Sequence, residues 1–259
     1  MRTPMRTPMR TTMRSVFGWA LLLSTAAGAQ VAAVHAPDGN SFQRLVSISV
    51  PAVPGAPFTL TLSTQWIRPL ADGSTITLVN HRLIARDAAG RVFQERRYLV
   101  PTQDPNADRI SNLQWTDPVK GEYYNCLSDT LVCQLTPYVS IPAEVAAVPG
   151  PIMDGKAFVT VQPLGTRMVE GIETQGTLET TTINAEAIGN DKPLVITKEF
   201  WYSPELKLNL MVERNDPRSG RQIFTVTSLT TSDPKSWFFQ MPAGFHLVDH
   251  RHTVESTGR

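Results

Sequence analysis

The sequence has little excess charge of either sign. Its 24 lysines and arginines nearly balance 23 aspartates and glutamates over 259 residues. Four of the arginines lie within the first 14 residues, so the rest of the chain is slightly acidic. Proteins that bind nucleic acid usually carry a clear basic excess. We therefore expect no nucleic-acid partner.

Motifs of common catalytic chemistry are also missing. The chain has no G-x-S-x-G nucleophile elbow, no H-E-x-x-H zinc motif and no glycine-rich phosphate loop. Aspartates and glutamates are scattered, mainly in turns, and no acid–base pair can be assigned among them. We expect a protein that is not an enzyme and that uses no cofactor. A hydrolase with an unfamiliar site is the alternative.

Histidine is scarce, at five residues. His250 and His252 would point the same way in a strand, which would make a weak metal pair. A pair without a third ligand is a poor zinc site. The favoured interpretation is a solvated tail, so no metal site is predicted.

No apolar run reaches the ~20 residues with which a helix spans a bilayer. Residues 16–23 are apolar, follow four arginines and precede Ala27, Gly28 and Ala29. This order of basic, apolar and small residues is typical of a secretory signal peptide, with an uncleaved membrane anchor as the alternative. We expect residues 1–29 to be a signal peptide cleaved after Ala29. The mature chain would then be periplasmic or secreted, without a transmembrane segment.

Only two cysteines are present, Cys126 and Cys133. Disulfides persist in oxidising compartments, so two cysteines this close in an exported chain favour a bridge across a loop or hairpin. A redox pair usually has C-x-x-C spacing, and a zinc site would need two further ligands. We predict a structural disulfide that stabilises the fold by roughly 2–3 kcal/mol.

Alternating apolar and polar residues are, by contrast, abundant. Phe58, Leu60, Leu62 and Trp66 fall on one parity, with threonine, serine and glutamine on the other. This is the period of a strand with one buried face. β-rich runs recur to residue 248, joined by turns that contain glycine or Asp-Pro. We predict a single β domain over residues 58–248.

Less regular segments flank and interrupt this domain. Pro51, Pro54 and Pro57 favour an extended lead-in over residues 30–57, and residues 249–259 are expected to be a frayed tail. A short helix is expected at residues 143–148 and a capped half-turn near residue 237. Strands are expected at residues 156–165 and 167–183, with bulges at Gly171 and Gly176.

Residues 200–210, FWYSPELKLNL, place an aromatic step before a proline. Pro204 has no N–H and is expected at a strand break. The leucines that follow it share a face and, with Trp201 or Phe200, should lie on the concave apolar side of a sheet. The segment is interpreted as a bend in a core strand.

Three pieces, VEGIETQGT, EFWYSPELKLNL with NDPRSGR, and WFFQMPAGF, resemble a group of uncharacterised exported bacterial proteins. In that group a strand headed by Trp-Tyr-Ser-Pro pairs through an Asp-Pro-x-x-Gly turn and is followed by a Phe-x-x-Pro close. The resemblance covers residues 58–248. It brings no assigned activity with it.

A more distant resemblance is to the periplasmic lipoprotein carriers with the LolA, LolB and RseB-like fold, which share the β meander and the Phe-x-x-Pro ending. It implies a mainly β fold, a strongly curved antiparallel sheet that forms an incomplete barrel, with one or two short helices. It also implies that acyl chains bind on the concave face. The sequence departs from these carriers because residues 41–57 supply little of their N-terminal amphipathic helix.

Aromatic and leucine side chains are the remaining candidates for a site. In a curved sheet they would line an apolar cavity, the usual form of a small-molecule site, although such side chains also fill cores. The predicted ligand-lining residues are Trp66, Trp115, Phe158, Trp201, Leu208, Leu210 and Phe224.

Two functions follow from these observations. The first is an exported, non-enzymatic periplasmic protein that binds or carries a hydrophobic ligand, such as a lipid or the acyl chain of a lipoprotein, on the concave face. The second is an interaction or sensor module that contacts an envelope protein and holds no small molecule.

Overall fold

The computed structural model describes residues 45–251, all within the unit Gln43–Arg259. Strands account for 55% of these residues and helix for 2%, so the fold is mainly β, as predicted. The predicted signal peptide and its cleavage after Ala29 lie outside the described residues, as does His252.

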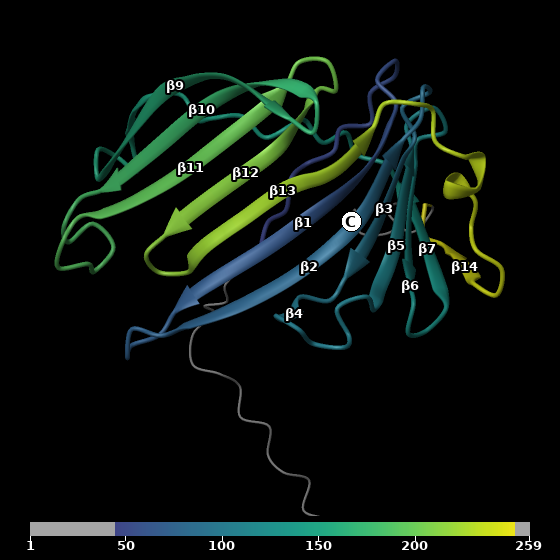
Figure 1. Ribbon diagram of the computed structural model, residues 1–259, viewed down its shortest axis with the longest axis horizontal. Coiled ribbons are helices and arrows are strands. Elements are labelled where there is room, and N and C mark those ends of the chain that lie inside the picture. The colour runs from purple at the N-terminus through teal and green to yellow at the C-terminus, as the bar shows by residue number, and fades with distance from the viewer. Residues whose placement is uncertain (1–44, 252–259) are drawn as a thin grey trace, which may run out of the picture. The chain divides into compact units, whose positions relative to one another are not determined.

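Fourteen strands and one 3₁₀ turn make up the described chain (Figure 1). They are β1 (Phe58–Pro69), β2 (Thr75–Arg86), β3 (Val92–Arg97), β4 (Val100–Pro101), β5 (Ile110–Asp117), β6 (Glu122–Leu127), β7 (Val132–Pro137), β8 (Gly150–Ile152), β9 (Ala157–Val169), β10 (Ile172–Ile183), β11 (Leu194–Ser203), β12 (Leu208–Asp216), β13 (Gly220–Thr230), η1 (Ser236–Phe239) and β14 (His246–Asp249).

The strands form one curved sheet that does not close. Its order is β14-β7-β6-β5-β3-β2-β1-β13-β12-β11-β10-β9-β8, with β4 paired to β2 off this path. All neighbours are antiparallel except β14, which runs parallel to β7. The predicted incomplete barrel is thus confirmed, and the pair β1–β13 joins an early strand to a late one.

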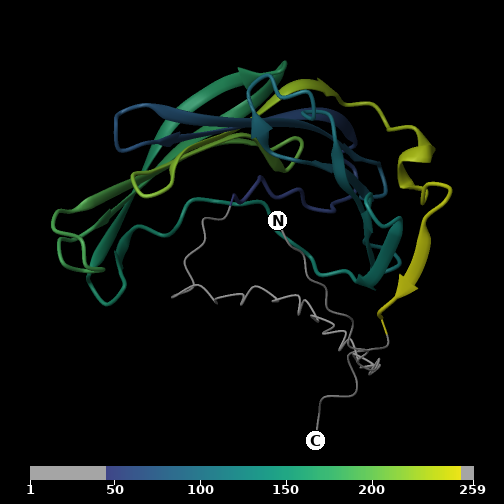
Figure 2. The ribbon, with the colours of Figure 1, turned by 90° about the horizontal axis from the view of Figure 1, so that it is seen from below.

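Two extended segments, residues 45–57 and 138–149, run below the curved sheet on its concave side (Figure 2). We call them the first and second straps. A helix was expected at residues 143–148, and this prediction is wrong. Prolines 142 and 149 leave too few residues for a helix, whose first turn is costly to nucleate. The strap's backbone finds partners on the sheet instead, because Asn209 donates to the carbonyl of Glu144 at 2.7 Å.

The half of the sheet formed by β8–β13, together with β1, buries its apolar side chains on the concave face. Leu60, Leu62 and Phe224 are almost fully buried there and pack with Ile48 of the first strap. The alternation predicted for residues 58–66 is confirmed, since β1 reads buried and half-buried by turns. This cluster is the principal core.

Most buried apolar side chains of the β2–β7 half lie on the opposite, convex face, while Ile84 and Val92 belong to the principal core. Phe93, Trp115 and the two cysteines form a second cluster that is covered by Phe238 of η1. Figure 2 shows the C-terminal segment that carries η1 on the outside of the sheet. The buried face therefore changes sides between the two halves.

The segment FWYSPELKLNL forms a hairpin. β11 ends at Ser203, residues 204–207 turn, and β12 begins at Leu208. The expected bend at Pro204 is present, although it separates two strands and does not kink one. Phe200, Leu206, Leu208 and Leu210 all lie in the principal core, as predicted.

Two expectations for the neighbouring hairpin need correction. β9 continues through Gly165 to Val169, so the predicted strand end at residue 165 is wrong. Gly171 belongs to the β9–β10 turn, where it and Glu170 both have positive φ, and not to a bulge. Gly176 does mark a bulge. A Cβ there would lie 2.7 Å from the Trp201 ring, so the close packing of this indole requires glycine.

Candidate ligand-binding site

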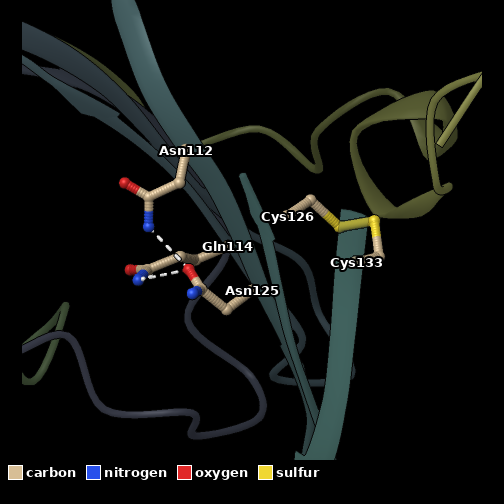
Figure 3. Close-up of a disulfide and its surroundings, with 5 residues drawn as sticks. All are labelled: Asn112, Gln114, Asn125, Cys126 and Cys133. Atoms are coloured by element: carbon tan, nitrogen blue, oxygen red, sulfur yellow. Dashed lines mark hydrogen bonds between the residues drawn. A yellow bond between two sulfur atoms is a disulfide. The ribbon is translucent and has the colours of Figure 1, made fainter. Parts of the chain in front are cut away.

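The concave face of the β2–β7 half is polar. Side chains alternate across a strand, so residues 94 and 96 of β3, 112 and 114 of β5, and 123 and 125 of β6 face one side, while Phe93, Trp115 and Cys126 face the other. Figure 3 shows this separation, with the amides of Asn112, Gln114 and Asn125 on one side of the strands and the disulfide on the other.

The predicted disulfide between Cys126 and Cys133 is present. The two residues face each other directly across the β6–β7 hairpin, and both are fully buried. The bridge therefore holds together the strands whose other face carries the polar groups.

A cavity of about 840 Å³ lies between this polar face and the two straps. Its volume falls within the ~300–1,000 Å³ range of small-molecule sites. Apolar side chains of the straps form one wall, and amide, hydroxyl and guanidinium groups of the sheet form the floor. The lining residues are Leu45, Val46, Ser47, Ile48, Ser49, Val50, Ala52, Gln94, Arg96, Asn112, Gln114, Thr116, Tyr123, Pro137, Tyr138, Val139 and Ile141.

A chain of hydrogen bonds organises the floor. Asn112 Nδ2 donates to Asn125 Oδ1 at 2.6 Å, and Gln114 Nε2 donates to the same oxygen at 3.1 Å. Arg96 Nε donates to Gln114 Oε1 at 2.7 Å. These bonds fix the amides on β5 and β6 and orient the Arg96 guanidinium beside them.

A second guanidinium lies beside the floor, between Gln94 and the first strap. Arg82 of β2 is only 3% exposed, and it donates to Gln94 Oε1 at 2.9 Å and to the hydroxyl of Ser47. Burial lowers the pKa of Arg82 well below its usual value, and repulsion from Arg96 lowers it further. Burial also lowers the pKa of Arg96, although the nearby Tyr123 raises it in part.

The carboxylates of these strands lie on the opposite face or at the strand ends. Glu95 pairs with Arg97 at 2.9 Å on the convex side. Glu122 pairs with Arg251 and accepts the Tyr124 hydroxyl at 2.9 Å. Arg96 is consequently the one charged residue among the described residues that line the cavity.

The structure distributes the sequence-predicted ligand-lining residues over several places. Leu208, Leu210 and Phe224 lie in the principal core, and Trp115 lies in the convex cluster. None of these four borders the large cavity.

The other three predicted residues lie apart from one another. The Trp66 indole donates to the carbonyl of Ser219 at 2.7 Å, and Arg167 stacks 3.7 Å above the Trp201 ring. Phe158 is 49% exposed on β9. The seven residues are thus not gathered into one cavity, and their contact with a ligand stays a prediction.

The histidines offer no constellation in the described part of the chain. His81 lies 3.0 Å from Asp108 on the surface, and the backbone N–H of His250 donates to Leu135 at 2.8 Å. No group of three or more potential metal ligands occurs within residues 45–251.

Sequence reasoning missed Arg82, Arg96 and the amides because residues 92–100 carry polar side chains on both faces. Only the register shows which polar parity faces the straps, since it pairs Gln94 with Gln114 and Arg96 with Asn112. The sequence did contain one indication of the site, because β2 and β3 each carry an arginine, Arg82 and Arg96, on the side that faces the straps.

The chain was compared with protein-family models, curated proteins and solved structures, and only solved structures match it. No protein-family model matches the sequence, and no curated protein matches it either. An uncharacterised conserved protein from Thermus thermophilus has a TM-score of 0.41 and 9% identity, over 75% of this chain and 91% of that one.

Two further structures are similar over a comparable part of the chain, and the second carries the LolA name anticipated from the sequence. A chain of the MucA/MucB complex from Pseudomonas aeruginosa gives a TM-score of 0.39 and 14% identity, over 76% of this chain and 59% of that one. A LolA superfamily protein from Nitrosomonas europaea gives 0.29 and 10%, over 73% and 91%. The chain is thus similar to LolA-superfamily proteins at low identity.

Within residues 45–251 the structure contains no helix of the length and apolarity required to cross a membrane.

Proposed function

We propose that this protein is exported to the periplasm and binds a hydrophobic ligand with a polar end, such as a lipid or an acyl chain, in the cavity below the β2–β7 half. The observation that carries the proposal is the cavity of about 840 Å³, walled by apolar strap residues and floored by polar groups. No catalytic step is part of the proposal. The export signal expected over residues 1–29 supports the location.

The strap wall supports binding of an apolar chain. Val139 is 75% exposed and Ile141 is 56% exposed, and both border the cavity with Val46. Apolar side chains grouped at an opening are costly in water and mark ligand or protein contacts. An acyl chain laid along them would remove this surface from water at about 25 cal/mol per Å².

Native mass spectrometry of the full chain purified from the periplasm tests the proposal directly, together with titration of the uncharged apolar probe N-phenyl-1-naphthylamine. We expect a co-purified lipid, or saturable probe binding that added lipid displaces. A protein that carries no lipid and takes up no probe contradicts the proposal.

A matched pair of variants assigns binding to the strap wall. Ile141→Glu places a charge in the wall and should weaken probe binding about tenfold, because it removes apolar contact and adds a group that resists desolvation. Val119→Glu changes an 81% exposed residue in the β5–β6 turn that does not line the cavity, and serves as the control. Equal affinities for the two variants would place the ligand elsewhere.

Contact with an envelope protein through the sheet edge is a second candidate. β8 pairs only with Ala157–Val159 of β9, so residues 160–169 have no outer strand partner in the described chain. A free edge can accept a strand from another protein, although Pro163 and Gly165 interrupt this one.

A photo-crosslinking residue at Met168, which is 62% exposed, should then capture one envelope protein reproducibly. The same residue at Val119 is the control, and equal capture from both positions argues against the edge.

A further inference from the structure

Three arginines on the concave face of β2 and β3 are buried or partly buried without a carboxylate. Arg82, Arg86 and Arg96 form no ion pair with any acidic residue of the described chain. A buried charge without a counter-charge is costly unless hydrogen bonds compensate it. Each arginine therefore needs hydrogen-bond acceptors, and the three differ in how many acceptors the protein supplies.

Arg86 shows how this fold satisfies a guanidinium internally. Its three nitrogens donate to the carbonyls of Ala56, Pro51 and Leu206, and its side chain stacks on Phe58. These bonds tie the first strap and the β11–β12 turn to the sheet. No further ligand is required at this position.

Arg96 differs because only its Nε is used. That atom donates to Gln114, whereas neither terminal nitrogen forms a hydrogen bond within the described residues. Neither terminal nitrogen is sealed from solvent either, and the side chain borders the cavity. A guanidinium in this state presents a fork of N–H donors, which matches the oxygens of a phosphate or carboxylate.

The surroundings of Arg96 strengthen its attraction for an anion. Arg82 lies close enough to repel it, and no carboxylate borders the cavity among the described residues. The amide of Gln94 and the hydroxyl of Tyr123 border the same space and can donate to further oxygens. The floor therefore has cationic and hydrogen-bonding groups with no internal anion.

We propose that the cavity recognises the anionic head group of an amphiphile, a phosphate or carboxylate bound by Arg96, while its apolar chain lies along the straps. This inference rests on the proposed function and specifies the ligand class at the same site. Arg82 supports the site through its charge and through the position it gives Gln94 and Ser47. Arg96 is the residue that touches the ligand.

Three probes separate the head group from the tail. Dodecyl phosphate carries both, dodecanol carries the tail alone, and inorganic phosphate carries the anion alone. We expect dodecyl phosphate to bind the full chain about ten- to a hundredfold more tightly than dodecanol, the effect of one charge-assisted hydrogen-bonded pair. Inorganic phosphate should bind more weakly than either amphiphile.

Variants assign the preference to Arg96. Arg96→Gln should reduce the affinity ratio of dodecyl phosphate to dodecanol to near one. Arg109→Gln removes an equal charge from an exposed pair with Asp129 outside the cavity and should leave the ratio unchanged. Gln94→Glu supplies Arg82 with an internal carboxylate and places an anion in the floor. It should lower the ratio even if Arg96→Gln fails to fold.

The results of these experiments separate recognition of the head group from binding of an apolar ligand. Equal binding of dodecyl phosphate and dodecanol overturns the head-group assignment and leaves the apolar-ligand function standing. If inorganic phosphate binds as tightly as dodecyl phosphate, the site binds a free anion, and the proposal of an amphiphilic ligand is wrong. If Arg96→Gln binds dodecyl phosphate over dodecanol with the same affinity ratio as the wild type, Arg96 does not bind the head group. Failure of all three probes, with no co-purified lipid, removes the proposed function as well.

Discussion

The two halves of the concave face treat positive charge in opposite ways. Below β8–β13, Arg214 pairs with Glu144 of the second strap, and Lys198 lies 3.2 Å from Glu179. Below β2–β7, Arg82 and Arg96 have only neutral partners. The same face of one sheet thus holds compensated cations at one end and uncompensated ones at the other.

The paired half uses its charges to fasten the straps. Arg214 donates to the carbonyl of Val46 and to the carboxylate of Glu144, and Glu179 accepts the backbone N–H of Ala147 at 2.7 Å. Its hollow of about 310 Å³ is bordered by charges of both signs. Paired charges therefore hold the second strap against β10 and β12, whereas the cavity below the β2–β7 half keeps an arginine without an acidic partner among the described residues.

A charge in the principal core should cause the greatest loss of stability. Leu208→Asp puts a carboxylate where the native side chain is completely buried in the principal core, so no folded protein should accumulate. Thr116→Asp places the same group on the concave face of the other half, where it borders the cavity, and should fold. Thermal melting of both variants checks this, and a normal melt for Leu208→Asp would remove Leu208 from the core.

A smaller loss is expected from the disulfide of the β2–β7 half. Replacing Cys126 and Cys133 together with alanine should lower the free energy of unfolding by roughly 2–3 kcal/mol, because the unfolded chain loses a short closed loop. Urea unfolding measures it. Reductant should destabilise the wild type by a similar amount and leave the double variant unaffected.

Exchanging the charge states of the two halves should shift stability in opposite directions. Glu144→Gln removes the acidic partner of Arg214 and should lower the free energy of unfolding by about 1 kcal/mol. Gln94→Glu gives buried Arg82 a carboxylate and should raise it by about 1 kcal/mol. Urea unfolding of both variants at low salt makes the comparison. Equal signs would mean that the halves do not differ in compensation.

The smallest effect concerns pH. Hydrogen bonds from Arg218 hold the pKa of Asp216 below its usual value, so this carboxylate stabilises the fold above its unfolded pKa, and the gain is lost as pH falls through the folded pKa. Asp216→Asn should cost less than about 1 kcal/mol at pH 7, because the pair is partly exposed, and nothing once pH falls well below 4. Arg82→Gln should show no such acid dependence. Unfolding curves at pH 3, 5 and 7 distinguish the two.

The sequence predicts the buried face of β1 better than that of β3, for a physical reason. Phe58, Leu60 and Leu62 alternate with polar residues, so the buried face can be recognised locally. In β3 residues 94–97 are polar on both parities, and the apolar cover of its convex side comes from Phe238, which is remote in sequence. The candidate site depends on the register of three such strands, which short-range patterns do not specify.

The pairing of β1 with β13 also has a consequence for how the chain reaches its folded state. Leu60 lies beside Leu229, so the central strand of the sheet gains its second neighbour only after nearly all of the chain is available. Contacts between residues so distant in sequence form slowly, because the loop between them must first be ordered. A chain of this design would remain incompletely folded while it is being synthesised, and its curved face would form only after the last long strand, β13, is available.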